Sequence, residues 1–154
     1  MNNIGIKLHL VQFLNVNLNI NSFNVEVTDN LQSDKFAITT LHNEADSNAF
    51  GIQFDLNLSH GEDFNLNIRA IAHFLTDSPY DRDFLDSDFT KVNAPAIAFP
   101  YIRTYISNLT LNSGYNPVIL PPYNFVEMNK IKEAEKSKAQ KKASSSKAKK
   151  VQKI

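Results

Sequence analysis

The sequence predicts an α+β fold: a four-stranded antiparallel sheet, a main helix over about residues 94–113 and a second, C-terminal helix over about 125–142. Before residue 76, apolar and polar residues alternate in several segments, which is the period of a strand with one buried face. In the two later segments, apolar residues recur at spacings of three and four, which is the period of a helix.

The longest alternating run lies in the first twenty residues. Even-numbered residues from 4 to 20 are aliphatic except Gln12, whereas most odd-numbered ones are polar. Val11 and Phe13 interrupt the polar side, so we expect them on the outer face of the sheet. A strand of this length is also expected to bend or bulge near residues 11–13.

The other three strands are predicted from shorter runs. An irregular stretch around Phe23 leads to a strand candidate at residues 36–41. Residues 50–58 and 64–74 alternate on either side of a turn that contains Gly61, which is typical of an antiparallel hairpin. The acidic stretch 76–92 predicts a loop with a helical turn, whose aromatic residues dock on the body.

The main helix is predicted from one apolar face, formed by Phe99, Ile102, Ile106 and Leu109. Asn93 is a candidate N-cap, and Gly114 is placed to end the helix with a positive φ. Pro100 predicts that the regular helix starts or bends there, because an interior proline costs about 3 kcal/mol.

The segment after Gly114 contains three prolines around an apolar Val-Ile-Leu run, so we expect an extended arm that packs on the protein. Asn124 and Glu127 then form a capping-box pattern at the start of the second helix. Its later turns consist of lysine, alanine and glutamate, and we expect them to fray into a disordered end.

The run from residue 99 to 125 resembles the signature segment of SecB-type protein-export chaperones. In that family a helix that opens on Phe-Pro-Tyr-x-Arg leads through a glycine to an extended Pro-x-Leu-x-x-Pro-x-Asn-Phe arm. In the same order, and at spacings that agree within about one residue, the matching residues are Phe99, Pro100, Tyr101, Arg103, Ser107, Gly114, Pro117, Leu120, Pro122, Asn124 and Phe125. The resemblance covers about residues 4–130 and excludes the lysine-rich end.

The resemblance implies a subunit of four strands and two helices, assembled as a dimer of dimers. It implies a cytoplasmic chaperone that wraps non-native precursor polypeptides and passes them to the SecA motor. A SecB-like branch instead serves toxin–antitoxin systems, where it shields an aggregation-prone antitoxin segment. The sequence leaves both roles open.

The formal net charge of zero conceals two oppositely charged parts. Ten lysines and two glutamates give residues 130–154 a charge of +8, and residues 1–129 carry −8. We therefore expect a SecB-like chaperone domain over 1–129 and a lysine-rich helix end and tail over 130–154. The tail is either a solubilising segment or an arm for an acidic partner, ribosome or nucleic acid.

The sequence offers little for catalysis, so we expect no enzyme, cofactor or metal. It has no cysteine, its four histidines lack metal-ligand spacing, and its four glycines are never grouped into a phosphate loop. Without a signal peptide or an apolar run long enough to span a membrane, a soluble intracellular protein is expected.

Aromatic and aliphatic surface remains as the candidate functional feature. A groove floored by aromatic rings could hold an unfolded chain through apolar contact, with hydrogen bonds from a strand edge. The candidate client-binding residues are Phe23, Phe36, Tyr101, Tyr123 and Phe125. Surplus apolar surface also predicts self-association, through Val11, Phe13, Ile71, Tyr105 and Leu111.

A small nucleic-acid-binding module with a basic tail is the alternative of a different class. The tail supplies positive charge, but the predicted sheet carries almost no basic residue besides Arg69. The sequence therefore favours the chaperone over this module.

Overall fold

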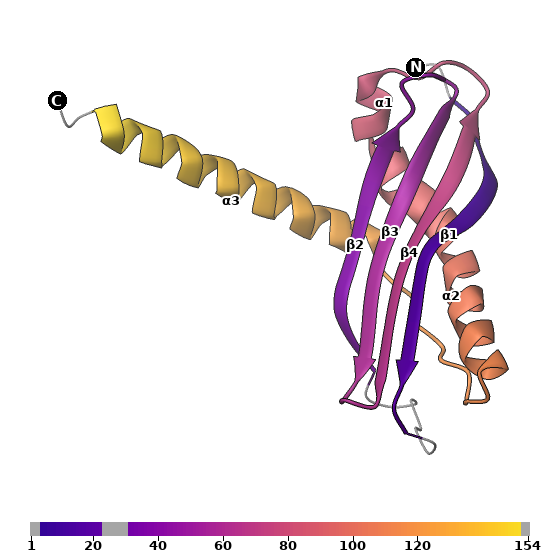
Figure 1. The fold of residues 1–154 in the computed structure, drawn as a ribbon. Helices are drawn as coiled ribbons and strands as arrows, with labels where there is room; N and C mark the ends of the chain where they lie inside the picture. Colours follow the sequence, from indigo (N-terminus) through magenta and orange to yellow (C-terminus); the bar gives the residue numbers. More distant parts are fainter. Residues whose placement is uncertain (1–3, 23–30, 152–154) are drawn as a thin grey trace. The chain divides into compact units, whose positions relative to one another are not determined.

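The computed structural model describes residues 4–22 and 31–151, which form two compact units, Met1–Pro121 and Pro122–Ile154. In the first unit the strands are β1 (Ile6–Ile20), β2 (Gln32–His42), β3 (Ala49–His60) and β4 (Phe64–Thr76) (Figure 1). They are followed by α1 (Arg82–Asp86), the π-helix η1 (Phe89–Asn93) and the main helix α2 (Ala94–Asn112). The second unit contains α3 (Phe125–Val151). The predicted α+β class is confirmed.

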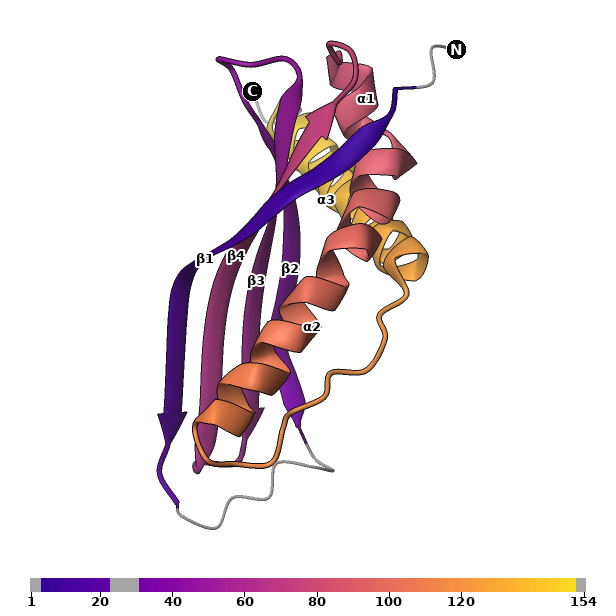
Figure 2. The same ribbon diagram turned by 90° about the vertical axis from the view of Figure 1, so that its right-hand side faces the viewer.

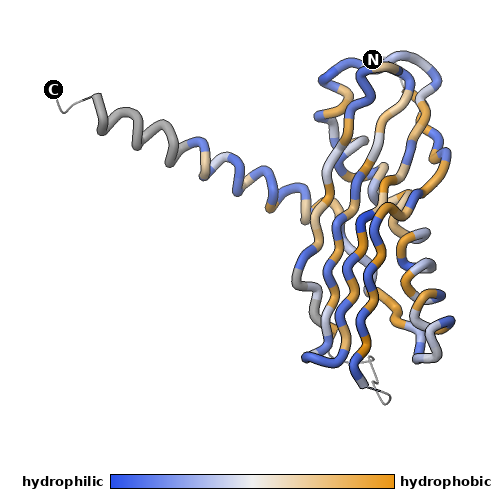
Figure 3. The backbone as a smooth tube through the Cα atoms, viewed as in Figure 1, coloured by the Kyte–Doolittle hydropathy of each residue, from blue (hydrophilic) through white to orange (hydrophobic). Residues whose placement is uncertain are grey.

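The four strands form one antiparallel sheet in the order β1-β4-β3-β2, and α2 crosses one of its faces (Figure 2). Along β3 and β4 buried and less buried residues alternate, as the hydropathy along the backbone also does (Figure 3). The predicted hairpin is these two strands, and Gly61 in its turn has a φ of 56°. The largest fully buried side chains include Phe54, Phe64, Phe74, Ile52, Leu66, Ile102 and Ile106.

Strand β1 has two register shifts against β4, one between Leu8 and Leu10 and one between Phe13 and Asn15. Each shift inserts one extra residue in β1. Between the two shifts, odd-numbered residues therefore face the side of the sheet that even-numbered residues face in the rest of the strand. Val11 and Phe13 therefore pair with the buried Ala72 and Ala70, on the face that α2 covers. Their predicted place on the outer face is wrong, because the strand contains two bulges on either side of them.

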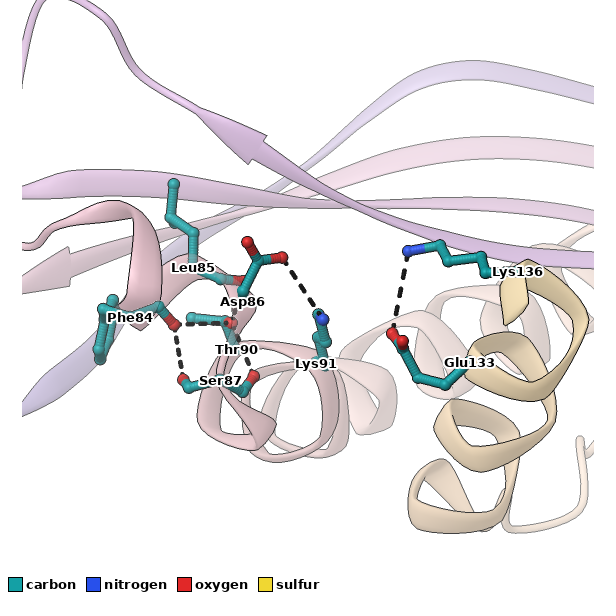
Figure 4. A network of polar contacts seen from close by, with 8 residues as sticks. All are labelled: Phe84, Leu85, Asp86, Ser87, Thr90, Lys91, Glu133 and Lys136. Carbon is teal, nitrogen blue, oxygen red and sulfur yellow. Dashed lines mark hydrogen bonds and ion pairs between the residues drawn. The ribbon is translucent and has the colours of Figure 1, made fainter. Parts of the chain in front are cut away.

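The acidic segment after β4 docks through its aromatic residues, as predicted. The ring of Phe84 contacts Phe50, Tyr80 and Phe89 at centroid distances of 5.8–6.0 Å. The buried Thr90 hydroxyl lies 2.7 Å from the carbonyl oxygen of Leu85, in the network drawn in Figure 4. These contacts join α1 to η1.

Helix α2 begins at Ala94, as predicted, but without the predicted cap at Asn93, and it ends as predicted. Asn93 is helical and makes no capping hydrogen bond, because η1 leads directly into α2. The helix also continues through Pro100, which is exposed to solvent. At the far end Gly114, with a φ of 87°, donates to the carbonyl of Leu111 at 3.0 Å.

The extended arm after α2 packs on that helix. The amide of Val118 donates to the hydroxyl of Thr110 at 2.9 Å, and both residues are buried. Leu120 is buried as well, whereas Ile119 between them is 71% exposed. The arm therefore presents one side to the protein and the other to solvent.

In the second unit, Asn124 caps α3 by accepting a hydrogen bond from the Glu127 amide at 3.1 Å. Glu133 and Lys136 form an ion pair at 3.8 Å on this helix (Figure 4). The helix runs to Val151, beyond the end predicted near residue 142, because alanine and lysine have high helix propensity and serine only a small penalty. The division into a chaperone domain over 1–129 and a lysine-rich end stays a prediction.

Candidate functional site

Three phenylalanine rings meet where α2 lies beside the outermost strand β2. Phe36 of β2 is half-buried, and its ring contacts Phe99 of α2 edge-on at a centroid distance of 5.8 Å. It also lies 6.4 Å from Phe54 of β3, and both Phe54 and Phe99 are buried. We call these three residues the Phe36 cluster. Phe36 is therefore the member of the cluster that is partly accessible to solvent.

The two flanks of α2 face opposite edges of the sheet. On one flank Phe99 contacts β2, and Thr110 holds the extended arm. On the other flank Tyr105 stacks on Phe13 of β1, with centroids 3.7 Å apart. Because β1 and β2 are the two end strands, α2 is fastened to both edges by aromatic contacts.

Among the predicted client-binding residues, Phe36 is the one in this cluster. Phe23 lies outside the described residues. Tyr101 is 58% exposed, and two residues of helix turn it about 200° away from Phe99. Tyr123 and Phe125 belong to the second compact unit, where Tyr123 is half-buried and Phe125 is buried. The binding role of all five stays a prediction.

The predicted self-association residues divide between two places. Ile71 pairs with Gln12 and Gln53 on the face that α2 leaves uncovered, and Leu111 of α2 is 55% exposed. Val11, Phe13 and Tyr105 instead lie between the sheet and α2. The bulges of β1 expose Leu10 and Leu14 in their stead, at 38% and 57%. Self-association stays a prediction.

The uncovered face of the sheet is otherwise polar. Asn57, Asn67 and Asn65 are linked by side-chain hydrogen bonds, and Arg69 donates to Asp55 at 2.7 Å. Burial raises the pKa of Asp55, but hydrogen bonds from Arg69 and Gln53 outweigh it and hold the pKa below its ordinary value. This face therefore differs in chemistry from the aromatic Phe36 cluster.

Arg103 matches the SecB-type signature, but sequence reasoning did not place it among the site residues. It is the one residue in α2 that carries a charge at neutral pH, and its Nε is buried with no hydrogen-bond partner in the part of the chain that the structure describes. The signal in the sequence is a single arginine within an apolar helix. The sequence could not indicate whether that arginine has an acceptor.

The described residues hold no group of three or more histidine, cysteine, aspartate or glutamate side chains that could bind a metal ion. Within the same residues, no helix is long and apolar enough to cross a membrane. The Phe36 cluster consists of hydrocarbon rings alone, so it offers apolar contact and no hydrogen-bonding side chain.

Comparisons with known proteins agree with the resemblance to SecB-type chaperones. A protein-export protein SecB of Magnetococcus marinus is 43% identical over 37 residues, or 24% of each chain. An uncharacterized protein of Methanocaldococcus jannaschii is 50% identical over 40 residues, or 26% of each chain. The chain thus spans about a quarter of the length of these curated relatives.

A solved structure has a similar fold. A SecB-like chaperone of Mycobacterium tuberculosis, in complex with a ChAD peptide from an antitoxin, superposes with a TM-score of 0.60 at 16% identity. The match covers 77% of this chain and 89% of that one. A family model described as preprotein translocase subunit SecB matches residues 14–136. Because that match covers most of the chain, the protein belongs to the SecB family.

Proposed function

We propose that the protein is a molecular chaperone that holds non-native, extended polypeptides without ATP. The observation that carries the proposal is the Phe36 cluster, in which a half-buried ring connects the surface beside β2 to the core. Membership of the SecB family and the fold shared with a SecB-like chaperone support it.

The physical basis is apolar contact that requires no particular client sequence. Burial of apolar surface contributes about 25 cal/mol per Å², whichever side chains supply it. A ring that is already packed on two others also loses little freedom when a client covers it. The net charge of −8 on residues 1–129 favours basic clients over acidic ones.

Independence from ATP is part of the proposal. The four glycines, Gly5, Gly51, Gly61 and Gly114, lie far apart, so the sequence offers no glycine-rich loop to cradle phosphates. Transient holding needs many weak contacts and no bond cleavage. We accordingly place the protein outside the enzymes.

The test is suppression of client aggregation. The full chain, without nucleotide, is added to a reduced, unfolded client whose aggregation is followed by light scattering. We expect wild type to suppress scattering and Phe36→Ala to suppress it less at equal concentration. Phe84→Ala is the matched control, because Phe84 is also a half-buried phenylalanine. Its ring contacts Phe50 and Tyr80 and is no part of the Phe36 cluster. Equal suppression by wild type and Phe36→Ala, or none by wild type, would contradict the proposal.

We propose two client classes, precursors for export and an antitoxin segment. The first follows from the family description and the second from the peptide bound to the similar chaperone. Competition separates them: an unfolded export precursor and an antitoxin peptide are each used to displace a labelled client. The class that displaces the client at the lower concentration is the preferred one.

Nucleic-acid binding is a second candidate function, and the lysines of α3 favour it. The described side chains of residues 130–140 are exposed, and they include four lysines, Lys130, Lys132, Lys136 and Lys138. Lysine neutralises phosphate, which gives binding that depends on salt and not on sequence. Loss of RNA binding on removal of residues 130–154 would support this candidate.

A further inference from the structure

Arg103 lies on the same flank of α2 as the contacts to β2 and the extended arm. Four residues of helix place it about 40° from Phe99, and seven place it about 20° from Thr110. Phe99 contacts Phe36, and Thr110 accepts from the Val118 amide. A helical side chain also covers the turn before its own Cα, which directs Arg103 toward Phe99. Arg103 is therefore a neighbour of the Phe36 cluster.

The Nε of Arg103 has an unmet hydrogen-bonding requirement. It is buried and, within residues 4–22 and 31–151, makes no hydrogen bond. Buried polar atoms in proteins are nearly always hydrogen-bonded, and an unmet buried donor destabilises the folded chain. Arg103 as a whole is half-buried, so a turn of its guanidinium group would bring Nε to a ligand that supplies an acceptor. Such a ligand would remove the penalty, and the free energy recovered would strengthen its binding.

We propose that Arg103 anchors the main chain of a bound polypeptide, with its buried Nε–H donating to a client backbone carbonyl. This inference rests on the proposed chaperone function and specifies the polar contact of its site. The Phe36 cluster would contact client side chains, while Arg103 would fix the backbone that carries them.

A backbone carbonyl suits this donor better than a client carboxylate. An extended chain offers a carbonyl about every 3.4 Å whatever its sequence, so every non-native client carries the acceptor. Carboxylates occur only at some positions, and the −8 charge of residues 1–129 repels clients that are rich in them. A main-chain contact thus agrees with holding clients of many sequences.

The experiment measures binding of a synthetic peptide by fluorescence anisotropy. The peptide is rich in leucine and phenylalanine, contains no carboxylate and has an amidated C-terminus. The full chain is compared with Arg103→Met, which keeps the length without a donor, and Arg103→Lys, which keeps the charge without Nε. We expect both variants to bind about tenfold more weakly, because a hydrogen bond from a charged donor is lost.

Thermal unfolding of the variants separates binding from structural support. Replacement of an unpartnered buried donor by an apolar group does not destabilise a fold, so we expect the melting temperature of Arg103→Met to equal or exceed that of wild type. A clear drop would identify Arg103 as structural and overturn the proposal.

A second series identifies the client atom. Each peptide amide is replaced in turn by an ester, whose carbonyl is a weaker acceptor. At least one ester should weaken binding to wild type and have no effect on Arg103→Met. Uniform ester effects on both proteins, or full affinity in Arg103→Lys, would overturn the anchor while leaving the chaperone intact. Failure of wild type to bind the parent peptide would overturn both proposals.

Discussion

The ring of Phe13 on β1 stacks on Tyr105 of α2, with centroids 3.7 Å apart and planes inclined by 16°. This contact joins the main helix to the edge strand at the opposite end of the sheet from Phe36. It exists because the two bulges of β1 turn Phe13 inward. The stack therefore depends on the bulges of β1 as well as on the position of α2.

The stack should contribute measurably to stability. We expect Phe13→Ala to lower the free energy of unfolding by about 2 kcal/mol, below the value for a fully buried ring because Phe13 is half-buried. A double-mutant cycle with Tyr105→Ala should give a coupling of about 1 kcal/mol. Urea unfolding measures both quantities. The control is Leu14→Ala, at a 57% exposed position, which should change stability by less than about 0.5 kcal/mol. Additive effects of Phe13→Ala and Tyr105→Ala would contradict the stack.

The hydroxyl of Thr110 should hold the extended arm. We expect Thr110→Val to destabilise the protein by about 1–3 kcal/mol, because the buried Val118 amide loses its acceptor. Thr110→Ser keeps the hydroxyl and should lose less. Denaturant unfolding compares the two variants. If valine proves as stable as threonine, the arm is held by Val118 and Leu120 packing alone.

The pair of Asp55 and Arg69 should make stability depend on pH. The folded-state pKa of Asp55 lies below its ordinary value of 3.8, so its contribution to stability is present above that value and is lost as pH falls below it. We expect Asp55→Asn to have a lower free energy of unfolding than wild type near neutral pH. The difference between the two proteins should become smaller below pH 3.8. Urea midpoints of both proteins at the two pH values measure the difference. A difference that stays constant with pH would contradict the prediction.

Removal of residues 130–154 should leave the body unchanged, because the described side chains of residues 130–140 are exposed. We expect the melting temperature and the suppression of client aggregation to match those of the full chain. Differential scanning calorimetry and light scattering measure them. A large drop in melting temperature would show that the lysine-rich segment packs on the protein.

In the same samples, RNA binding that weakens as salt is raised, and disappears with the deletion, would support the second candidate function.

Much of the fold could be predicted from local patterns. The β3–β4 hairpin alternates evenly, and its turn glycine has the positive φ that the turn requires. The C-terminal end of α2 follows from Gly114 in the same way. A bend or bulge near residues 11–13 was predicted, because Val11 and Phe13 interrupt the polar side. That there are two bulges, on either side of these residues, could not be predicted, because Leu10 and Leu14 are apolar and continue the period-two pattern. The helical start at Asn93 depends on η1, whose π-type hydrogen bonds have no local signal.

The candidate site was predicted less completely. Phe36 was singled out, but its partner Phe99 was assigned only to the helix core, because the sequence does not show which strand the helix crosses. The role of Arg103 depends on the absence of an acceptor among the described residues, which is a property of three-dimensional packing. Contacts between segments about sixty residues apart require the register of the sheet, which local patterns do not supply.

The two bulges also have a consequence for comparing relatives. Fifteen residues of β1 run along the thirteen β4 residues from Phe64 to Thr76, so His9 and Leu14 are the surplus pair. A homologue that lacked both residues would have an evenly pleated edge with every inward-facing side chain preserved. Alignments of this family should therefore allow a one-residue gap at each of these positions. Without such gaps, residues 10–13 would be matched to side chains that face the other way.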